Sequence, residues 1–154
     1  MRSTSLALDG LHEKAVQLDI PRARGHRRAM FATLLQVAIG GAIGASARYL
    51  TNVGAMRLIG PGFPWGTLAV NILGSFLMGV LVVFLAHKDA TRLAPFMVTG
   101  ILGGFTTFSA FSLDVMTLIE RGQINLALFY GFASVLLSLG AIAMALVLFR
   151  GVFQ

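Results

Sequence analysis

The sequence predicts an all-α integral membrane protein with four transmembrane helices, of which the third is broken at its middle. Hydrophobic residues make up 56% of the 154 residues and charged residues only 12%, whereas soluble domains have about 25% charged residues. Four apolar runs of roughly 20 residues each are long enough to cross a hydrocarbon core. The third run contains a cluster of glycines and hydroxyl side chains at its centre.

The first, second and fourth spans read as uninterrupted helices. The first covers about residues 30–50 and has a single charge, Arg48, close to its end. The second covers about 65–86, after a proline-glycine turn at 61–64, and Asn71 is its one strongly polar interior residue. The fourth, about 124–149, is the most uniformly apolar, and Ser134 and Ser138 share one of its faces because they are four residues apart.

The third span, about 93–119, is expected to form two half-helices. Its central sequence, GILGGFTTFSAFS at 100–112, combines helix-breaking glycines with hydroxyls. Non-helical backbone at membrane depth is tolerated where protein or a water-filled path satisfies it, so such a break usually marks an ion or substrate site. Unwound carbonyls at Gly103 and Thr106 suit a hard cation such as sodium. Phe105, Phe108 and Phe111 are three residues apart, and their positive ring edges suit a small anion.

The N-terminal region differs from the membrane domain. Residues 1–29 are expected to be a basic tail or a start-codon extension, with Met30 as a possible initiator, and residues 30–150 the membrane domain. The net charge is +6, but six of the twelve Lys and Arg residues precede position 29, a pattern of membrane topology and not of a nucleic-acid surface. Beyond the tail, three loop cations fall on each side of the membrane. This balance permits insertion both ways, whereas the tail arginines would bias the termini inward.

Several notable residues also have ordinary structural interpretations. Gly40, Gly41 and Gly44 form a small-residue face that allows close helix packing, and no strand precedes them as dinucleotide binding would require. Arg48 either reaches for the interface or has a structural or vestibule role. Asn71 either joins helices or lines a polar path. The third span could also be a glycine-kinked helix that serves packing only. The hydroxyls of Ser134 and Ser138 could bond only the carbonyls of their own helix.

Three motifs together resemble the Fluc/CrcB fluoride channels. They are GGAIGASARY in the first span, GTLAVNILGSFLMG in the second and GGFTTFSAFSLD in the third. They occur in the family order, and the resemblance covers about residues 31–150, which is the whole membrane domain.

The resemblance implies passive export of fluoride across the bacterial cytoplasmic membrane, which relieves fluoride toxicity. It also implies a multi-pass, antiparallel, dual-topology homodimer in membrane lipid, with two pores and a structural sodium ion at the dimer centre. By this resemblance, the carbonyls of Gly103 and Thr106 would bind sodium, and Arg48 would lie near a vestibule. The expected pore residues are Asn71, Phe108 and Phe111, with a polar track at Ser134 and Ser138 and further polar lining at Thr107 and Ser109.

Other classes of function remain as alternatives. A small multidrug resistance exporter would need a membrane carboxylate, usually in the first span, but spans one and two contain no Asp or Glu. A non-transporting membrane scaffold would use the glycines and serines for packing only. An intramembrane enzyme is disfavoured because the three histidines lie outside the spans and no Ser-Lys constellation lies within them.

Overall fold

The computed structural model describes the backbone of residues 2–88 and 90–153, and the side chains of residues 25–88 and 90–151. Contacts divide the chain into two units, residues 1–35 and 36–154. Helix α1 (Arg2–Leu58) runs through both units. In the first unit, residues 25–35 are helical and their side chains are exposed. The second unit, residues 36–154, contains the remaining helices.

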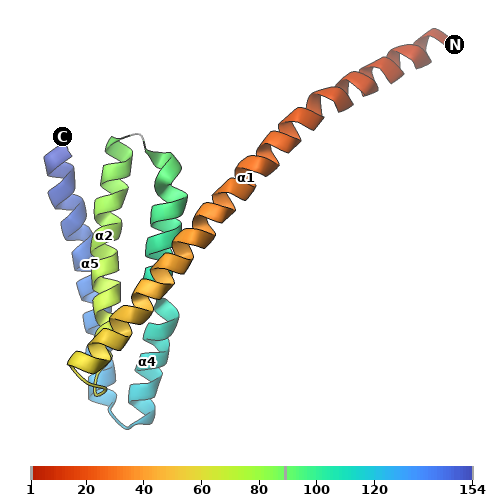
Figure 1. The fold of residues 1–154 in the computed structure, drawn as a ribbon. Coiled ribbons are helices and arrows are strands. Elements are labelled where there is room, and N and C mark those ends of the chain that lie inside the picture. Colours follow the sequence, from red (N-terminus) through yellow and green to blue (C-terminus); the bar gives the residue numbers. More distant parts are fainter. Residues whose placement is uncertain (1, 89, 154) are drawn as a thin grey trace. The chain divides into compact units, whose positions relative to one another are not determined.

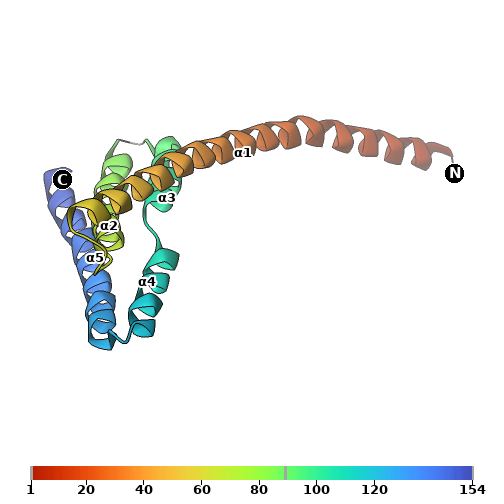
Figure 2. The same ribbon diagram turned by 60° about the horizontal axis from the view of Figure 1, so that its bottom comes forward.

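Four helical segments have the length and composition to cross a membrane, which confirms the predicted spans. They are Gly25–Leu58, Trp65–His87, Thr91–Glu120 and Ile124–Gly151. Helix α2 (Trp65–His87) has 23 residues, which at 1.5 Å per residue spans about 34 Å. It packs side by side with α5 (Ile124–Phe153), as Figures 1 and 2 show. These two helices form the continuous part of the bundle.

The third span is divided in the way that the sequence predicts. It begins with a short 3-10 helix, η1 (Thr91–Leu93), and a π-helix, η2 (Pro95–Leu102), followed by one turn, α3 (Gly103–Phe105). Thr106 and Thr107 then adopt extended backbone angles, with ψ values of 156° and 123°. Helix α4 (Phe108–Glu120) starts immediately afterwards. Figure 2 shows this extended link between α3 and α4.

Glycines of α1 allow its close approach to the third span. A Cβ atom on Gly40 would overlap the carbonyl oxygen of Phe96, and one on Gly44 would overlap the carbonyl oxygen of Ile101. A Cβ on Gly104 would lie only 2.6 Å from the carbonyl oxygen of Gly41. The predicted packing role of these small residues is therefore confirmed, because backbone meets backbone only where side chains are missing.

The interior of the bundle is small and its outer surface is apolar. Leu68, Leu118, Ala127 and Tyr130 form a buried cluster that joins α2, α4 and α5. Large apolar side chains such as Phe132 cover the outside of the helices, as expected for a protein whose solvent is lipid or a neighbouring subunit.

The helix ends differ from the sequence prediction at α1 and α5. Helix α1 continues from the predicted residue 50 to Leu58, and α5 continues from 149 to Phe153. Polar residues end an apolar run without ending the helix, since backbone hydrogen bonding continues beyond the hydrocarbon core. The turn after α1 instead uses Gly60, whose φ of 103° favours glycine.

We expect Gly44→Ala to lower the thermal stability of the protein in detergent, because its methyl group would overlap the Ile101 carbonyl. Overpacking of this kind costs about 1–3 kcal/mol. Gly54→Ala in the same helix is the matched control, since a Cβ there meets nothing within 4 Å, and alanine raises helix propensity by about 1 kcal/mol. Equal unfolding midpoints for the two variants would contradict the close packing.

Candidate functional site

The break in the third span is held by one side chain, Asn71 of α2. Its Nδ2 donates to the carbonyl oxygen of Thr107 at 3.0 Å, and its Oδ1 accepts from the amide of Thr107 at 2.9 Å. The carboxamide thus satisfies both backbone groups of one residue, as a neighbouring strand would. Unpaired backbone groups at this depth would each cost several kcal/mol. Asn71 therefore makes the extended conformation possible.

The hydroxyls of the break are also engaged. Thr107 caps α4, because its Oγ1 accepts from the amide of Ala110 at 3.1 Å. The same atom lies 3.2 Å from Oγ of Ser109. Thr106 turns its hydroxyl back to the carbonyl of Leu102, which accepts it at 2.9 Å. Most polar atoms of the break thus have a hydrogen-bond partner within the protein, so the extended conformation is a specific part of the fold.

The orientation of α4 favours negative charge at the break. Its first residue, Phe108, directly follows the extended pair, so its first turn, in which only the Ala110 amide is capped by a side chain, lies near the middle of the third span. The N-terminus of a helix carries a partial positive charge, which acts more strongly where water is excluded. Half-helices in transporters use this end to meet anionic groups.

A cavity of about 530 Å³ lies beside the break. Helix α2 contributes Asn71 and Ser75 to its wall, and α5 contributes Ser134 and Ser138. The phenylalanines of α4 and the backbone of the break complete it. The predicted site residues that line this one cavity are Asn71, Gly103, Thr106, Thr107, Phe108, Phe111, Ser134 and Ser138.

The two serines of α5 in the wall of this cavity have buried hydroxyls. The Oγ of Ser138 has no hydrogen-bond partner in the described part of the chain, and that of Ser134 has only the Tyr130 hydroxyl near enough to interact with it. The interpretation that they bond their own helix is therefore wrong for this structure. A buried polar group without a partner costs about 1–3 kcal/mol. An acceptor that enters the cavity, such as a small anion, would remove that penalty.

Two phenylalanines of α4 stand together at the same cavity. The ring centroids of Phe108 and Phe111 are 5.5 Å apart with an interplanar angle of 43°, and Phe108 is 77% exposed. Phe105 differs from the prediction: it is buried, precedes the break and does not line the cavity. The break resets the helical phase between residues 105 and 108, so their spacing of three does not place them on one face.

The predicted sodium ligands are backbone carbonyls next to the break. Gly103 has helical angles, φ −64° and ψ −35°, so its backbone is not unwound as predicted. Its carbonyl would normally accept the amide of Thr107, but that amide donates to Asn71 instead. Thr106 has an extended backbone and directly precedes Thr107, the residue that Asn71 binds. These two carbonyls therefore fit a cation, although one chain supplies fewer oxygens than a cation such as sodium takes.

Two predicted residues lie outside the cavity wall. Arg48 is half-buried on α1 and does not line the cavity. Ser109 does not line it either, and its hydroxyl lies instead against that of Thr107. Their expected roles as vestibule and lining residues therefore remain predictions.

Sequence reasoning missed four polar residues near the cavity. Ser75 lines the wall one turn beyond Asn71. Tyr130 lies one turn before Ser134, is fully buried, and donates its hydroxyl to Oδ2 of Asp114 at 3.2 Å. Thr67 is buried one turn before Asn71. The i, i+4 spacing to residues already chosen would have found three of these four.

Comparison with known proteins decides the family. The family described as "CrcB-like protein, Camphor Resistance (CrcB)" matches residues 35–146. The chain belongs to the CrcB family. A relative from Cereibacter sphaeroides, named fluoride-specific ion channel FluC, is 66% identical over 122 residues, which cover 79% of this chain and 98% of the relative.

Further relatives of this CrcB chain carry the same name. The protein from Paracoccus denitrificans is 59% identical over 121 residues, covering 79% of this chain and 97% of the relative. That from a Ruegeria species is 58% identical over 124 residues, covering 80% and 98%. With four apolar spans and bacterial relatives of nearly full coverage, the chain is a multi-pass protein of the bacterial inner membrane.

We expect Asn71→Asp to destabilise the fold, because a carboxylate can accept the Thr107 amide but cannot donate to the Thr107 carbonyl. The lost bond and the added charge at depth should lower the free energy of unfolding by about 1–3 kcal/mol. The comparison is thermal unfolding in detergent beside Asn125→Asp, which places the same charge on an exposed residue of α5. Similar midpoints in both variants would show that Asn71 does not hold the break.

Proposed function

We propose that this CrcB-family chain is a fluoride-selective ion channel that exports fluoride across the cytoplasmic membrane and so relieves fluoride toxicity. The name shared by relatives at 58–66% identity supports this function. The observation that carries it is the cavity at the break, whose wall combines the N-terminus of α4 with two serines of α5 whose hydroxyls are not bonded to their own helix. It is a channel and not an enzyme.

Passive export is sufficient for this task. Hydrogen fluoride is neutral and crosses membranes, then dissociates near neutral internal pH and leaves the anion inside. The membrane potential, negative inside, drives an anion outward at about 2.3 kcal/mol per 100 mV. The protein therefore has to supply only a selective path, without an energy source.

The cavity has the groups that a dehydrated fluoride ion requires. Fluoride holds its water tightly, so a selective pore must replace that water with donors. Ser134 and Ser138 supply two hydroxyl donors, and the α4 N-terminus supplies partial positive charge. The rings of Phe108 and Phe111 line the same wall, and their positive edges suit a small anion while their bulk narrows the path.

One proposed pore residue, Phe108, faces outward from the protomer, which favours a second copy. Phe108 is 77% exposed although it lines the cavity, so the chain alone does not enclose a path. The carbonyls of Gly103 and Thr106 are likewise too few for a cation, and the same pair from a second copy would double them. We therefore extend the proposal to a homodimer with sodium between the copies, and the near balance of loop charges beyond the tail suits an antiparallel arrangement.

Proton-coupled multidrug export is the second candidate, because Asp114 and Glu120 lie in the last part of the third span. Asp114 of α4 is half-buried, but its Oδ2 accepts the hydroxyl of Tyr130. A coupled exporter would move its cargo in response to a pH gradient, whereas a channel responds only to the concentration gradient of its ion and to the voltage.

The deciding experiment measures anion release from potassium-loaded liposomes after valinomycin addition, with fluoride and chloride in parallel. We expect rapid fluoride release with little chloride release. Phe108→Ile and Phe111→Ile should each slow fluoride release by about tenfold, which corresponds to ~1.4 kcal/mol of barrier. Phe31→Ile is the matched control, since Phe31 is an exposed ring of α1 outside the cavity.

The possible results separate the candidate functions. Release of neither ion from a correctly assembled dimer would favour a non-transporting scaffold. Release that depends on a pH gradient would favour the coupled exporter. Full flux in both phenylalanine variants would leave the channel standing but remove the aromatic wall from its path.

Removal of sodium should weaken the dimer if the carbonyls of Gly103 and Thr106 hold this ion. We expect a lower unfolding midpoint and a larger monomer fraction in lithium or N-methylglucamine buffer than in sodium buffer. Potassium at matched ionic strength controls for general salt effects. A midpoint independent of the cation, after prolonged exchange, would speak against the sodium site.

A further inference from the structure

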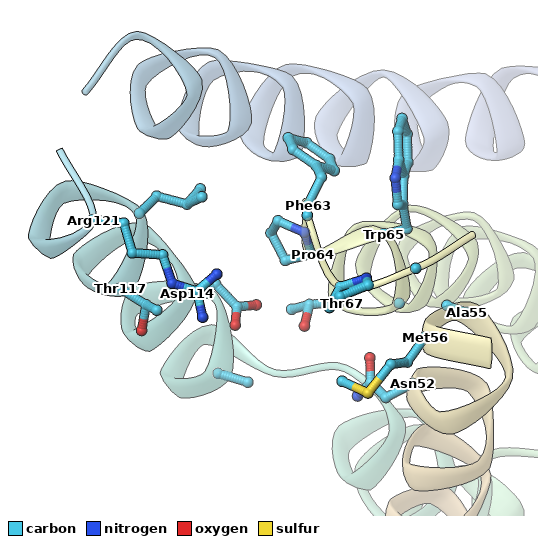
Figure 3. Close-up of a pocket in the computed structure, with 16 residues that line it drawn as sticks. Asn52, Ala55, Met56, Phe63, Pro64, Trp65, Thr67, Asp114, Thr117 and Arg121 are labelled. Carbon is cyan, nitrogen blue, oxygen red and sulfur yellow. The ribbon is translucent and has the colours of Figure 1, made fainter. Parts of the chain in front are cut away.

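A second cavity lies at the end of the bundle where α1 meets α2 and α4 meets α5. It has a volume of about 330 Å³. Its wall is formed by the end of α1, the loop at 60–64, the start of α2 and the outer half of α4. In Figure 3 the side chains of Thr67, Asp114 and Arg121 point into the same space. Arg121 directly follows the last residue of α4 and is exposed, so the cavity is open at the membrane surface.

Two rows of polar side chains connect this cavity with the one at the break. On α2, Thr67 lines the second cavity, whereas Asn71 and Ser75 line the first. These three residues are four apart and share one helix face. The polar row on α2 therefore runs from Ser75 through Asn71 to Thr67, with one residue per helical turn, towards the surface.

The second row lies on α5 and has the same spacing. Ser138 and Ser134 line the first cavity, and Tyr130 follows one turn nearer the surface. Tyr130 donates its hydroxyl to Asp114, which lines the second cavity. Polar groups thus follow one another from the break to the open end without an intervening apolar turn on either helix.

The charge at this open end is unfavourable for an anion unless it is offset. Asp114 is a carboxylate at the wall, and the C-terminus of α4 adds partial negative charge at the same end. Arg121 supplies the one basic side chain in the wall. The local field on an anion therefore depends on this residue.

We propose that this cavity is the aqueous mouth of the fluoride path at this surface, and that Arg121 offsets the negative charge that would otherwise repel fluoride from it. The inference rests on the proposed channel function and adds the place and the residue of ion capture. Without Arg121 the charges of the wall would all be negative, and a cleft lined by one sign of charge lowers the local concentration and the rate of arrival of ions of that sign. Arg121 therefore sets the rate at which fluoride reaches the polar rows, and it takes no part in selectivity at the break.

The experiment compares Arg121→Gln with the unchanged protein in the liposome assay at two ionic strengths. The Debye length is about 30 Å at 0.01 M and about 3 Å at 1 M, so an impermeant salt switches the field of Arg121 on or off. We expect fluoride release to fall about two- to threefold at low ionic strength, as one charge acting through water over ~6–10 Å predicts. At high ionic strength the two proteins should release fluoride equally.

Two further variants make the result specific. Arg121→Lys keeps the charge and should retain the flux at low ionic strength. Arg57→Gln removes a charge from the same end of the bundle, but Arg57 is exposed and does not line the cavity. Its effect should be clearly smaller than that of Arg121→Gln.

Three results would overturn the inference: no effect of Arg121→Gln at low ionic strength, an equal effect of Arg57→Gln, or a loss that persists at high ionic strength. The first two deny a role of this cavity, and the third indicates a structural role of Arg121. Failure of the channel function itself is recognised separately, because the unchanged protein would then release no fluoride at either ionic strength.

Discussion

The hydrogen bonds between Asn71 and Thr107 are the constraint on which the rest of the site depends. They satisfy both backbone groups of Thr107 and so permit an extended segment inside an apolar bundle. They also leave the Gly103 carbonyl without the amide that would continue the helix, and they fix the point where α4 starts. The carbonyls that we propose for sodium and the helix N-terminus that we propose for fluoride thus arise from the same two bonds.

The close packing of α1 against the third span supports this break from the other side. Gly40 and Gly44 bring the backbone of α1 directly against the π-helix and α3. A π-helix has wider turns than an α-helix and often occurs at functional sites. The first half of the third span is therefore positioned by backbone contact with α1, and the second half by Thr107 and the core with α2 and α5. The break joins two parts that are held by different partners, although both also contact α2.

Much of this arrangement follows from composition and spacing. Span lengths, the broken third span and the small-residue face depend on local rules that a sequence displays directly. Tertiary geometry decided the rest. Phe105 leaves the expected aromatic face because two extended residues change the helical phase. Gly103 keeps helical angles, since the bond from the Thr107 amide to Asn71 frees the Gly103 carbonyl without unwinding Gly103 itself. Ser134 and Ser138 were found by spacing, but only the folded chain shows that their hydroxyls are not bonded to their own helix.

The balance of charge along the proposed path explains why a selective site and a capture site would be separate. At the break, fluoride must lose its water, and fixed neutral donors can replace that water without trapping the ion as a full positive charge would. At the surface, the ion is still hydrated and only needs to be attracted, for which a charged and exposed arginine is suited. Placing Arg121 at the mouth and hydroxyls at depth combines fast arrival with weak binding, which are the two conditions for rapid conduction.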